Sequence, residues 1–260
     1  MEYWTYKMDP VRYTDDLYYI GSNAGPAWLI KSADGLILLD TGFPQTTYQL
    51  TENLRELGYT CKDVKHIIHS HGHIDHVGAT RAILEISGAK TYIGEGDADM
   101  VRGKNQLQWT NEFGMPYFEP FEPDVLIKDG DKIKIGDKTF YFRNVPGHTQ
   151  GTLAIFFNVT ENGKEYRAGM FGGAGLNTMS LEYLDKYNLP RTLRDEFLKS
   201  LKSVYDEKVE VHLGNHLGDN KHREKVLELG GDKNPFLDGS TWKWFLDKRY
   251  SEAEEYFKKN

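Results

Sequence analysis

The stretch SHGHIDHV, residues 70–77, places three histidines and one aspartate within six positions. It directly follows residues 64–69, which we interpret as a buried strand, and it precedes a helical pattern at 77–86. A turn from a strand into a helix directs alternate side chains into one space at the edge of a sheet. This stretch therefore predicts a polar cluster at a sheet edge.

The four side chains of this cluster have the chemistry of metal ligands. His71 and His73 can reach one metal ion, and Asp75 and His76 can reach a second. Imidazole and carboxylate groups are ligands that suit zinc. Burying four such groups with neither a metal nor full hydrogen bonding would be costly, which argues against a purely structural role.

Two more histidines follow predicted strands in the same way. His148 lies in VPGHT after a strand that ends at residue 145, and His216 lies in LGNH after a strand that ends at residue 213. A glycine close to each histidine lets the backbone approach its neighbours. Three strand ends that deliver ligands to one edge are what a two-metal hydrolytic site requires.

The remaining pattern predicts an α/β fold in a single domain, residues 1–260. Strands are expected at 17–21, 27–31, 36–40, 64–69, 90–93, 125–127, 132–135, 139–145, 152–158, 165–171 and 210–213. Helical segments are expected at 46–57, 77–86, 181–205, with an interruption at Pro190, and 240–258. In both halves strands are followed by helices, which predicts two sheets face to face with helices outside.

An aromatic stretch at 95–123 interrupts this regular pattern. It contains Trp109, Phe113 and Phe121 without a clean period, and it is expected to form a long loop or lid. Such a loop could form a pocket wall, a core under the loop or a dimer contact. The sequence leaves these three open.

Composition excludes several classes of partner. The 260 residues include 32 basic and 39 acidic side chains, a net charge of −7, and a surface of that sign repels nucleic acid. No stretch approaches the roughly 20 apolar residues of a membrane span, and the first residues lack the features of a secretion signal. We therefore expect a cytoplasmic protein with a small-molecule substrate, and a processed secreted form stays open.

The linked histidine motifs resemble those of the metallo-β-lactamase fold superfamily. They are HxHxDH at 71–76, PGHT at 146–149 and GxH at 214–216, and LLDTG at 38–42 is similar to that family's opening motif. The set is far more specific than an isolated HxHxDH. It implies an αββα sandwich of two mixed sheets flanked by helices, with metal ions at one edge.

The resemblance also implies a role for each ligand. His71, His73 and His148 would hold a first zinc ion, and Asp75, His76 and His216 would hold a second. Asp40 would accept a hydrogen bond that orients one of these ligands.

This sequence departs from the family pattern at one position, and the departure narrows the choice of subfamily. Many family members, such as glyoxalase II, lactonases and phosphodiesterases, carry an aspartate that bridges both metals in a Gly-Asp pair after a strand. This sequence has Gly172-Gly173 there. The pattern is then similar to one subclass of true metallo-β-lactamases, with His-His-His and Asp-His-His sites. Because one anionic ligand is missing, the second zinc ion is expected to bind more weakly.

The resemblance implies a hydrolase in which a hydroxide held between the metals attacks a carbonyl carbon, with Asp75 as the catalytic residue that orients it. The ligand set favours a β-lactam, and hence antibiotic resistance, while a lactone or thioester hydrolase is the alternative. The missing export signal keeps open a metabolic hydrolase with incidental β-lactam turnover. Two other classes with this fold are disfavoured. Diiron oxygen reductases would need a glutamate in place of His73, and nuclease relatives carry a large extra domain and a basic surface, which this sequence lacks.

The other polar residues singled out have smaller expected roles. Asn177 is a candidate substrate contact, because it follows the glycine-rich turn near the site. His69 is expected to be packed inside the protein, His66 and His212 to lie at strand edges, and His222 to be solvated or at the pocket rim.

Overall fold

A computed structural model describes residues 2–115 and 117–260. Residue 116, which falls in the predicted 95–123 loop, lies outside the described residues. No helix of the described part combines the length and the apolar character that a membrane crossing requires.

The first sheet has seven strands in sequence order. They are β1 Val11–Arg12, β2 Leu17–Tyr19, β3 Trp28–Ser32, β4 Gly35–Leu39, β5 Val64–Ile68, β6 Lys90–Gly94 and β7 Val125–Ile127. β1 to β4 pair antiparallel, and β4 to β7 pair parallel. The parallel strands need crossover connections, which helices supply, so the carboxyl ends of β4, β5 and β6 meet at one edge.

The second sheet has five strands in the order β12-β11-β10-β9-β8. They are β8 Lys132–Ile135, β9 Lys138–Asn144, β10 Leu153–Glu161, β11 Lys164–Phe171 and β12 Val211–Leu213. β8 to β11 form an antiparallel meander, and β12 pairs parallel to β11 at the edge.

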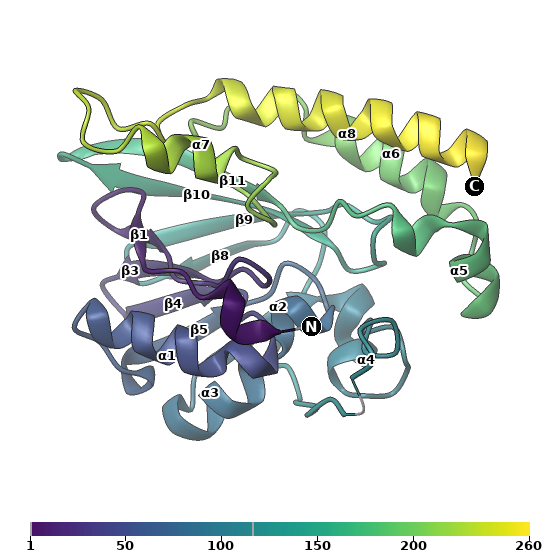
Figure 1. The fold of residues 1–260 in the computed structure, drawn as a ribbon, viewed down its shortest axis with the longest axis horizontal. Helices are drawn as coiled ribbons and strands as arrows, with labels where there is room; N and C mark the ends of the chain where they lie inside the picture. Colours follow the sequence, from purple (N-terminus) through teal and green to yellow (C-terminus); the bar gives the residue numbers. More distant parts are fainter. Residues whose placement is uncertain (1, 116) are drawn as a thin grey trace.

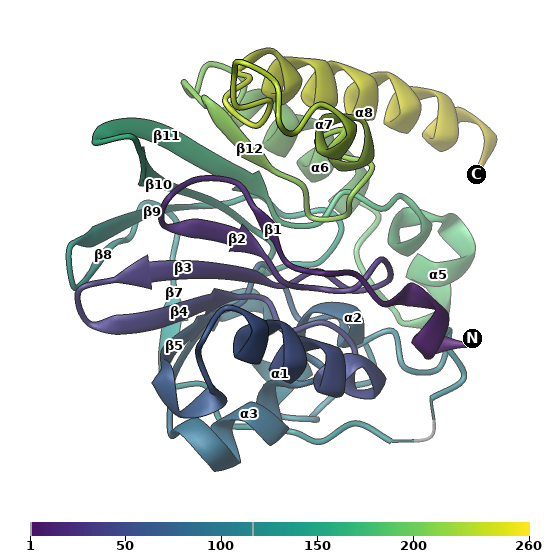
Figure 2. The ribbon, with the colours of Figure 1, turned by 60° about the vertical axis from the view of Figure 1, so that its left-hand side comes forward.

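Helices cover the outer face of each sheet. Those in the first half of the chain are α1 Thr47–Glu56, α2 Ile74–Val77, α3 Thr80–Ser87 and α4 Ala98–Val101, and those in the second half are α5 Leu181–Lys186, α6 Leu193–Ser203, α7 His222–Leu227 and α8 Ser240–Lys259. Figure 1 shows α1 and α3 below the first sheet and α6 and α8 above the second, and the turned view agrees (Figure 2). The predicted αββα sandwich of two mixed sheets is confirmed.

The main core lies between the two sheets. Trp28 and Ile37 from the first sheet meet Phe140, Phe157 and Leu213 from the second, and all five side chains are fully buried. Burying such a side chain stabilises the fold by about 1.5–3 kcal/mol, and this common core fixes the two sheets against each other. The loops at the strand ends that carry the histidines are thereby brought to one edge.

The structure differs from the predicted elements in three places. β1 and α7 were not predicted: β1 has only two residues, and α7 only six. The predicted helical segment 181–205 does not count among these differences, because it consists of α5 and α6 and is interrupted around Pro190, as predicted. The predicted helix at 77–86 begins earlier, because α2 starts at Ile74 inside the histidine motif.

Candidate metal centre

The chain after β5 places two histidines side by side. β5 ends at Ile68, and the backbone stays irregular until His73, whose extended conformation precedes α2. Nε2 of His71 lies 3.0 Å from Nδ1 of His73, and both side chains are buried. Nδ1 of His71 lies 3.1 Å from the Ser70 hydroxyl. The His71 ring is thereby turned so that Nε2 faces His73.

His148 joins this pair from the second sheet. It follows β9, and its Nδ1 donates to the carbonyl oxygen of Gly175 at 2.7 Å, which leaves Nε2 directed at the other two rings. The preceding Gly147 has φ +145° and packs its Cα side against Phe197, where a Cβ would overlap the phenyl ring. One nitrogen each from His71, His73 and His148 lie within 4.8 Å of one another. We call these three residues the first triad.

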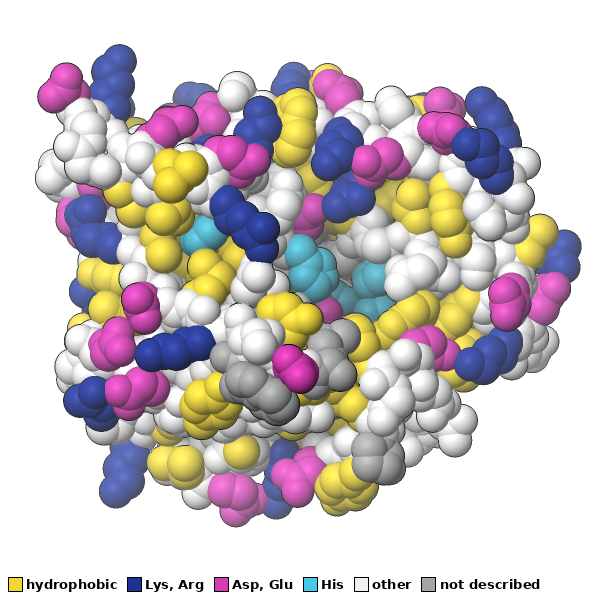
Figure 3. All heavy atoms as spheres, in the orientation of Figure 1, with side chains coloured by type: hydrophobic (Ala, Val, Ile, Leu, Met, Phe, Trp, Pro, Cys, Tyr) yellow, Lys and Arg dark blue, Asp and Glu magenta, His cyan; other side chains and the backbone are white. Residues whose placement is uncertain are grey.

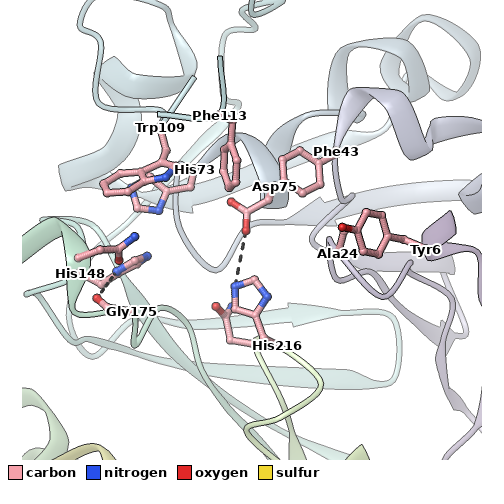
Figure 4. A pocket seen from close by; sticks show the side chains of 12 residues that line it. Tyr6, Ala24, Phe43, His73, Asp75, Trp109, Phe113, His148, Gly175 and His216 are labelled. Atoms are coloured by element: carbon pink, nitrogen blue, oxygen red, sulfur yellow. Dashed lines mark hydrogen bonds and ion pairs between the residues drawn. The ribbon is translucent and has the colours of Figure 1, made fainter. Parts of the chain in front are cut away.

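Asp75, His76 and His216 form a second triad next to the first. Their ligand atoms also lie within 4.8 Å of one another. Asp75 Oδ2 is 3.3 Å from Nε2 of His76 and 3.5 Å from Nε2 of His216 (Figure 4). Asp75 and His76 are buried in α2, whereas the His216 side chain is 52% exposed.

Asp40 lies beside the second triad and contacts His76. It follows β4 with φ +61°, a left-handed conformation that aspartate tolerates better than most residues. Its carboxylate accepts hydrogen bonds from His76 Nδ1 at 2.8 Å, from the Ser70 backbone N–H at 2.8 Å and from the Ser70 hydroxyl at 2.7 Å. Asp40 therefore fixes the His76 ring with Nε2 toward Asp75.

The protonation states of these groups suit metal ligation. Burial lowers the pKa of His71 and His73 well below the usual value and that of His148 to about 4, so all three are neutral at pH 7. Burial alone would raise the pKa of Asp75, but the neighbouring His76 outweighs it, and the pKa of Asp75 is lowered. Neutral imidazoles and an ionised carboxylate are the forms that bind metal ions.

His76 provides the most direct test of a cation at the second triad. Burial alone would lower its pKa, but the carboxylates of Asp75 and Asp40 outweigh burial and raise the pKa to about 10. Its Nε2 is buried, and Oδ2 of Asp75 lies 3.3 Å from it. A metal ion between Asp75 and His76 would take the place of the proton that these carboxylates favour on this nitrogen. The two triads therefore fit a pair of metal ions.

A cavity of about 370 Å³ opens onto both triads. Histidine side chains lie at the base of a hollow in the space-filling view (Figure 3), and His73, Asp75, His148 and His216 line one side of the cavity. Its other lining residues are Tyr6, Ala24, Phe43, Trp109, Phe113, Gly175, Asn177 and Asn215. Asn177, predicted as a substrate contact, does lie at this cavity.

The aromatic side chains of the cavity come from three segments that are distant in sequence. Tyr6 belongs to the 3-10 helix Tyr3–Tyr6, Phe43 follows β4, and Trp109 and Phe113 belong to the 95–123 loop. Trp109 has φ +68°, a strained conformation for a bulky residue, and its ring lies against His73 and Tyr183. Part of the aromatic loop thus forms a pocket wall, while Phe121 is buried against α2 and β6.

The glycines that replace the bridging aspartate leave no room for a side chain. A Cβ on Gly173 would overlap the His148 ring, and one on Gly172 would overlap the Leu153 carbonyl group. A carboxylate at either position would require His148 or β10 to move. The site is therefore shaped for two triads without a bridging aspartate.

The other histidines lie away from the triads. His69 is buried, with Nε2 3.2 Å from the Thr80 hydroxyl, as predicted. His212 lies on the edge strand β12, whereas His66 lies on the interior strand β5. The prediction for His222 is wrong: its side chain is fully buried, because the unpredicted α7 turns it inward against the Tyr13 hydroxyl at 2.7 Å.

Sequence reasoning missed three polar or aromatic residues of the cavity, Asn215, Phe43 and Tyr6. Asn215 precedes His216, and its side chain donates to the Ser70 hydroxyl at 3.1 Å. Its position directly before the predicted ligand His216 could have indicated that it lies at the cavity. Tyr6 is brought to the site only by the path of the N-terminal segment across the fold, and no local pattern indicates it.

Several relatives match parts of this chain. An uncharacterised protein of Aquifex aeolicus is 30% identical over 141 residues, 54% of this chain and 61% of that protein. An acyl-coenzyme A thioesterase of Bos taurus is 20% identical over 60% of this chain and 62% of its own length. A hydroxyacylglutathione hydrolase of Gloeothece citriformis is 31% identical over 41% of this chain and 34% of its own length. The chain thus spans less than two thirds of each of these relatives.

Solved structures match over the whole chain. BJP-1, a subclass B3 metallo-β-lactamase of Bradyrhizobium japonicum, superposes with a TM-score of 0.89 at 25% identity and covers 100% of this chain and 97% of its own. The class B3 di-zinc metallo-β-lactamase LRA-12 from an Alaskan soil metagenome superposes with a TM-score of 0.83 at 26% identity, over 98% and 97%.

The family model of the metallo-β-lactamase superfamily matches residues 20–160, more than half of the sequence and the part that holds five of the six triad residues. The chain belongs to the metallo-β-lactamase superfamily, a family of metal-dependent hydrolases.

Proposed function

We propose that this protein is a cytoplasmic zinc-dependent hydrolase that opens a small cyclic amide, a β-lactam. One observation carries the proposal: two triads, His-His-His and Asp-His-His, meet at one cavity where the packing of Gly172 and Gly173 excludes a bridging carboxylate. The likeness to class B3 β-lactamases over nearly the full length of both chains supports it.

The triads would divide the metal binding between them. His71, His73 and His148 would hold one zinc ion, and Asp75, His76 and His216 the other. When bound, zinc supplies a Lewis acid that lowers the pKa of a bound water to about 7 and polarises a carbonyl group. Asp40 keeps His76 turned toward Asp75 through the 2.8 Å hydrogen bond to Nδ1.

Asp75 is the residue that would act on the attacking water. Its lowered pKa keeps it ionised at neutral pH, and one of its oxygens faces His76 and His216. The other oxygen can accept a hydrogen bond from the water and orient it toward the carbonyl carbon. The same carboxylate is placed to hold the proton that the departing amide nitrogen requires.

The rest of the cavity would bind the substrate body. Trp109, Phe113 and Phe43 offer apolar faces to a ring or an acyl substituent. Asn177 and Asn215 offer neutral amide donors to a substrate carboxylate or carbonyl oxygen. Among the described residues that line the cavity there is no lysine or arginine, so these amides would carry the recognition of an anionic substrate.

The test is hydrolysis of a chromogenic cephalosporin by purified protein in defined zinc. We expect turnover that a chelator abolishes and added zinc restores, and a loss of roughly 10²–10⁴-fold in Asp75→Asn. Asp124→Asn is the matched control, because Asp124 contacts Thr91 at the opposite end of β6, and its turnover should stay at the wild-type rate. A protein that holds zinc and turns over no cephalosporin would refute the β-lactam assignment.

A thioester hydrolase is the second candidate, because two of the matched relatives are named as hydrolases of thioesters. These matches cover 62% and 34% of the relatives' lengths, less than the B3 structures do. The same preparation should be assayed with an acyl-coenzyme A and a hydroxyacylglutathione by release of free thiol. A higher kcat/KM for either thioester than for the cephalosporin would move the assignment to this class.

A further inference from the structure

A buried carboxylate outside both triads lies directly behind the first one. Asp97 ends the 3-10 helix Glu95–Asp97, which follows β6, and its side chain is fully buried. Its Oδ2 accepts hydrogen bonds from the Gly72 backbone N–H at 2.9 Å and the Thr149 hydroxyl at 2.6 Å. Its Oδ1 accepts one from the Gly151 backbone N–H at 2.7 Å.

These three donors belong to the two segments that supply the first triad. Gly72 stands between His71 and His73, and Thr149 directly follows His148. One carboxylate therefore joins a segment of the first sheet to a segment of the second at the point where both present metal ligands.

Backbone packing supports the same junction. A Cβ on Gly94 would overlap the carbonyl group of Gly151, and a Cβ on Gly96 would lie 2.7 Å from the carbonyl carbon of Gln150. A Cβ on Gly151 would lie within 2.9 Å of Cβ of Asp97. The turn at 94–97 and the turn at 149–151 thus approach backbone to backbone, and a side chain at any of these glycines would separate them.

We propose that Asp97 is a positioning residue for the first metal ion. By holding residue 72 and residues 149–151 at a fixed separation, it sets the three nitrogens of His71, His73 and His148 at metal-binding distance before a metal arrives. This inference rests on the metal centre of the proposed function and not on its substrate. Its consequence is specific: the first metal should depend on Asp97, and the second should not.

The carboxylate form of the residue is needed because every partner is a donor. An asparagine at position 97 can turn its oxygen toward Gly72 and Thr149 or toward Gly151, but its NH₂ group then faces an N–H or hydroxyl donor on the other side. Asp97→Asn keeps the size of the side chain and breaks the junction at one end. Thr149→Val removes the hydroxyl's hydrogen bonds to Asp97 and Thr152. It is the milder variant, because Asp97 keeps both of its backbone N–H donors.

The experiment measures zinc affinity of the metal-free protein by competition with a chromophoric chelator, together with thermal unfolding with and without zinc. We expect Asp97→Asn to weaken the tighter site by about 10–100-fold and to leave the weaker site within about threefold of wild type. The rise in Tm on adding zinc should shrink. Thr149→Val should weaken the tighter site in the same direction by a smaller factor, which keeps the test decisive if Asp97→Asn does not fold.

Asp124→Ala is the control for a merely structural effect. It removes two hydrogen bonds to Thr91 at the far end of β6, and it should lower the Tm of the metal-free and zinc-loaded forms equally with both affinities unchanged. A fall in Tm of Asp97→Asn with unchanged affinity at the tighter site, or equal weakening of both sites, would overturn the proposal. A wild-type chain that binds no zinc would refute this inference and the proposed function together, whereas zinc binding without β-lactam turnover would refute only the substrate.

Discussion

The two triads lie side by side, but the fold supports them differently. The first triad draws His71 and His73 from the end of a central strand and His148 from the end of β9, and Asp97 ties both segments together. In the second triad, His216 stands on the loop 214–220 after the three-residue edge strand β12, with half of its side chain exposed. Asp75 and His76 are as firmly buried as the first triad.

This difference separates a preformed site from one that depends on a loop. Ligands held by buried strand ends lose little conformational entropy when a metal binds, whereas a ligand on an exposed loop must be ordered at that moment. The missing bridging aspartate already implies weaker metal binding at the second triad. The position of His216 on an exposed loop gives a second structural reason for the same expectation. The sites should therefore fill in order, the first triad before the second.

The largest expected effect comes from removing one ligand of each triad. His71→Ala should reduce cephalosporin turnover to that of the chelated wild-type protein, because Nε2 of His71 faces His73 at the centre of the first triad. His216→Ala should keep one tightly bound zinc ion and lose the second, with measurable residual turnover. Metal content after dialysis and kcat on the same samples check both expectations.

His66→Ala is the matched control for these variants. His66 is the middle residue of β5, and its ring contacts Tyr92 and Asp34. It should retain both metals and wild-type turnover. If His216→Ala lost both zinc ions, metal binding at the two triads would be coupled. The first triad would then not be a preformed site that binds zinc independently of the second.

The ligands could be predicted from sequence because each of the three segments that carry them follows a strand. His71, His148 and His216 all come within a few residues of a strand end, and a sheet edge collects such positions whatever the details of packing. Asp40 was predicted in another way, from the resemblance of LLDTG at 38–42 to the family's opening motif. Local order along the chain was sufficient for these residues.

Residues whose place depends on packing between distant segments could not be predicted. Asp97 lies behind the first triad only because the turn after β6 packs against the turn at 149–151. The local sequence of residues 95–97 does not indicate that contact. His222 was misplaced because a six-residue helix, α7, gives too short a pattern to show which way its first residue points. Tyr6 reaches the cavity through the path of an irregular segment.

The loop that carries His216 is held from outside by the last helix. The His216 backbone N–H donates to Asp219 Oδ2 at 3.1 Å, and Oδ1 of the buried Asp219 pairs with Arg249 of α8 at 2.7 Å. Arg249→Met removes the cation and leaves the carboxylate of Asp219 unpaired, so the loop should shift. We expect roughly 10-fold or greater weakening of the second zinc site and an unchanged first site, measured by chelator competition.

Lys248→Met tests whether any lost charge on α8 has this effect. Lys248 precedes Arg249 and pairs only loosely with Glu252, at 3.9 Å, with both side chains about 40% exposed. Both zinc affinities should stay at wild-type values in this variant. Weaker zinc binding at the first site in Arg249→Met would show that α8 supports both triads. It would contradict the view that only the second triad depends on the loop that α8 holds.

The smallest expected effect concerns β12, the strand from which that loop extends. His212 is buried there against Trp242 and Phe245, and burial lowers its pKa to about 3. In the unfolded chain its pKa is about 6.5, so as pH falls below that value the unfolded state takes up a proton that the folded state excludes. His212 therefore costs stability progressively as pH drops from 6.5 toward 3.

His212→Asn removes this titration and keeps a polar side chain of similar shape. Between pH 7 and pH 5.5 the metal-free wild-type protein should lose about 1 kcal/mol more unfolding free energy than the variant does. The other buried histidines titrate equally in both proteins, so urea unfolding of the pair at the two pH values isolates His212. Equal losses of unfolding free energy in the two proteins would mean that β12 becomes exposed to water well before the rest of the sheet unfolds. The strand that precedes His216 would then be less stable than the exposure of His216 alone indicates.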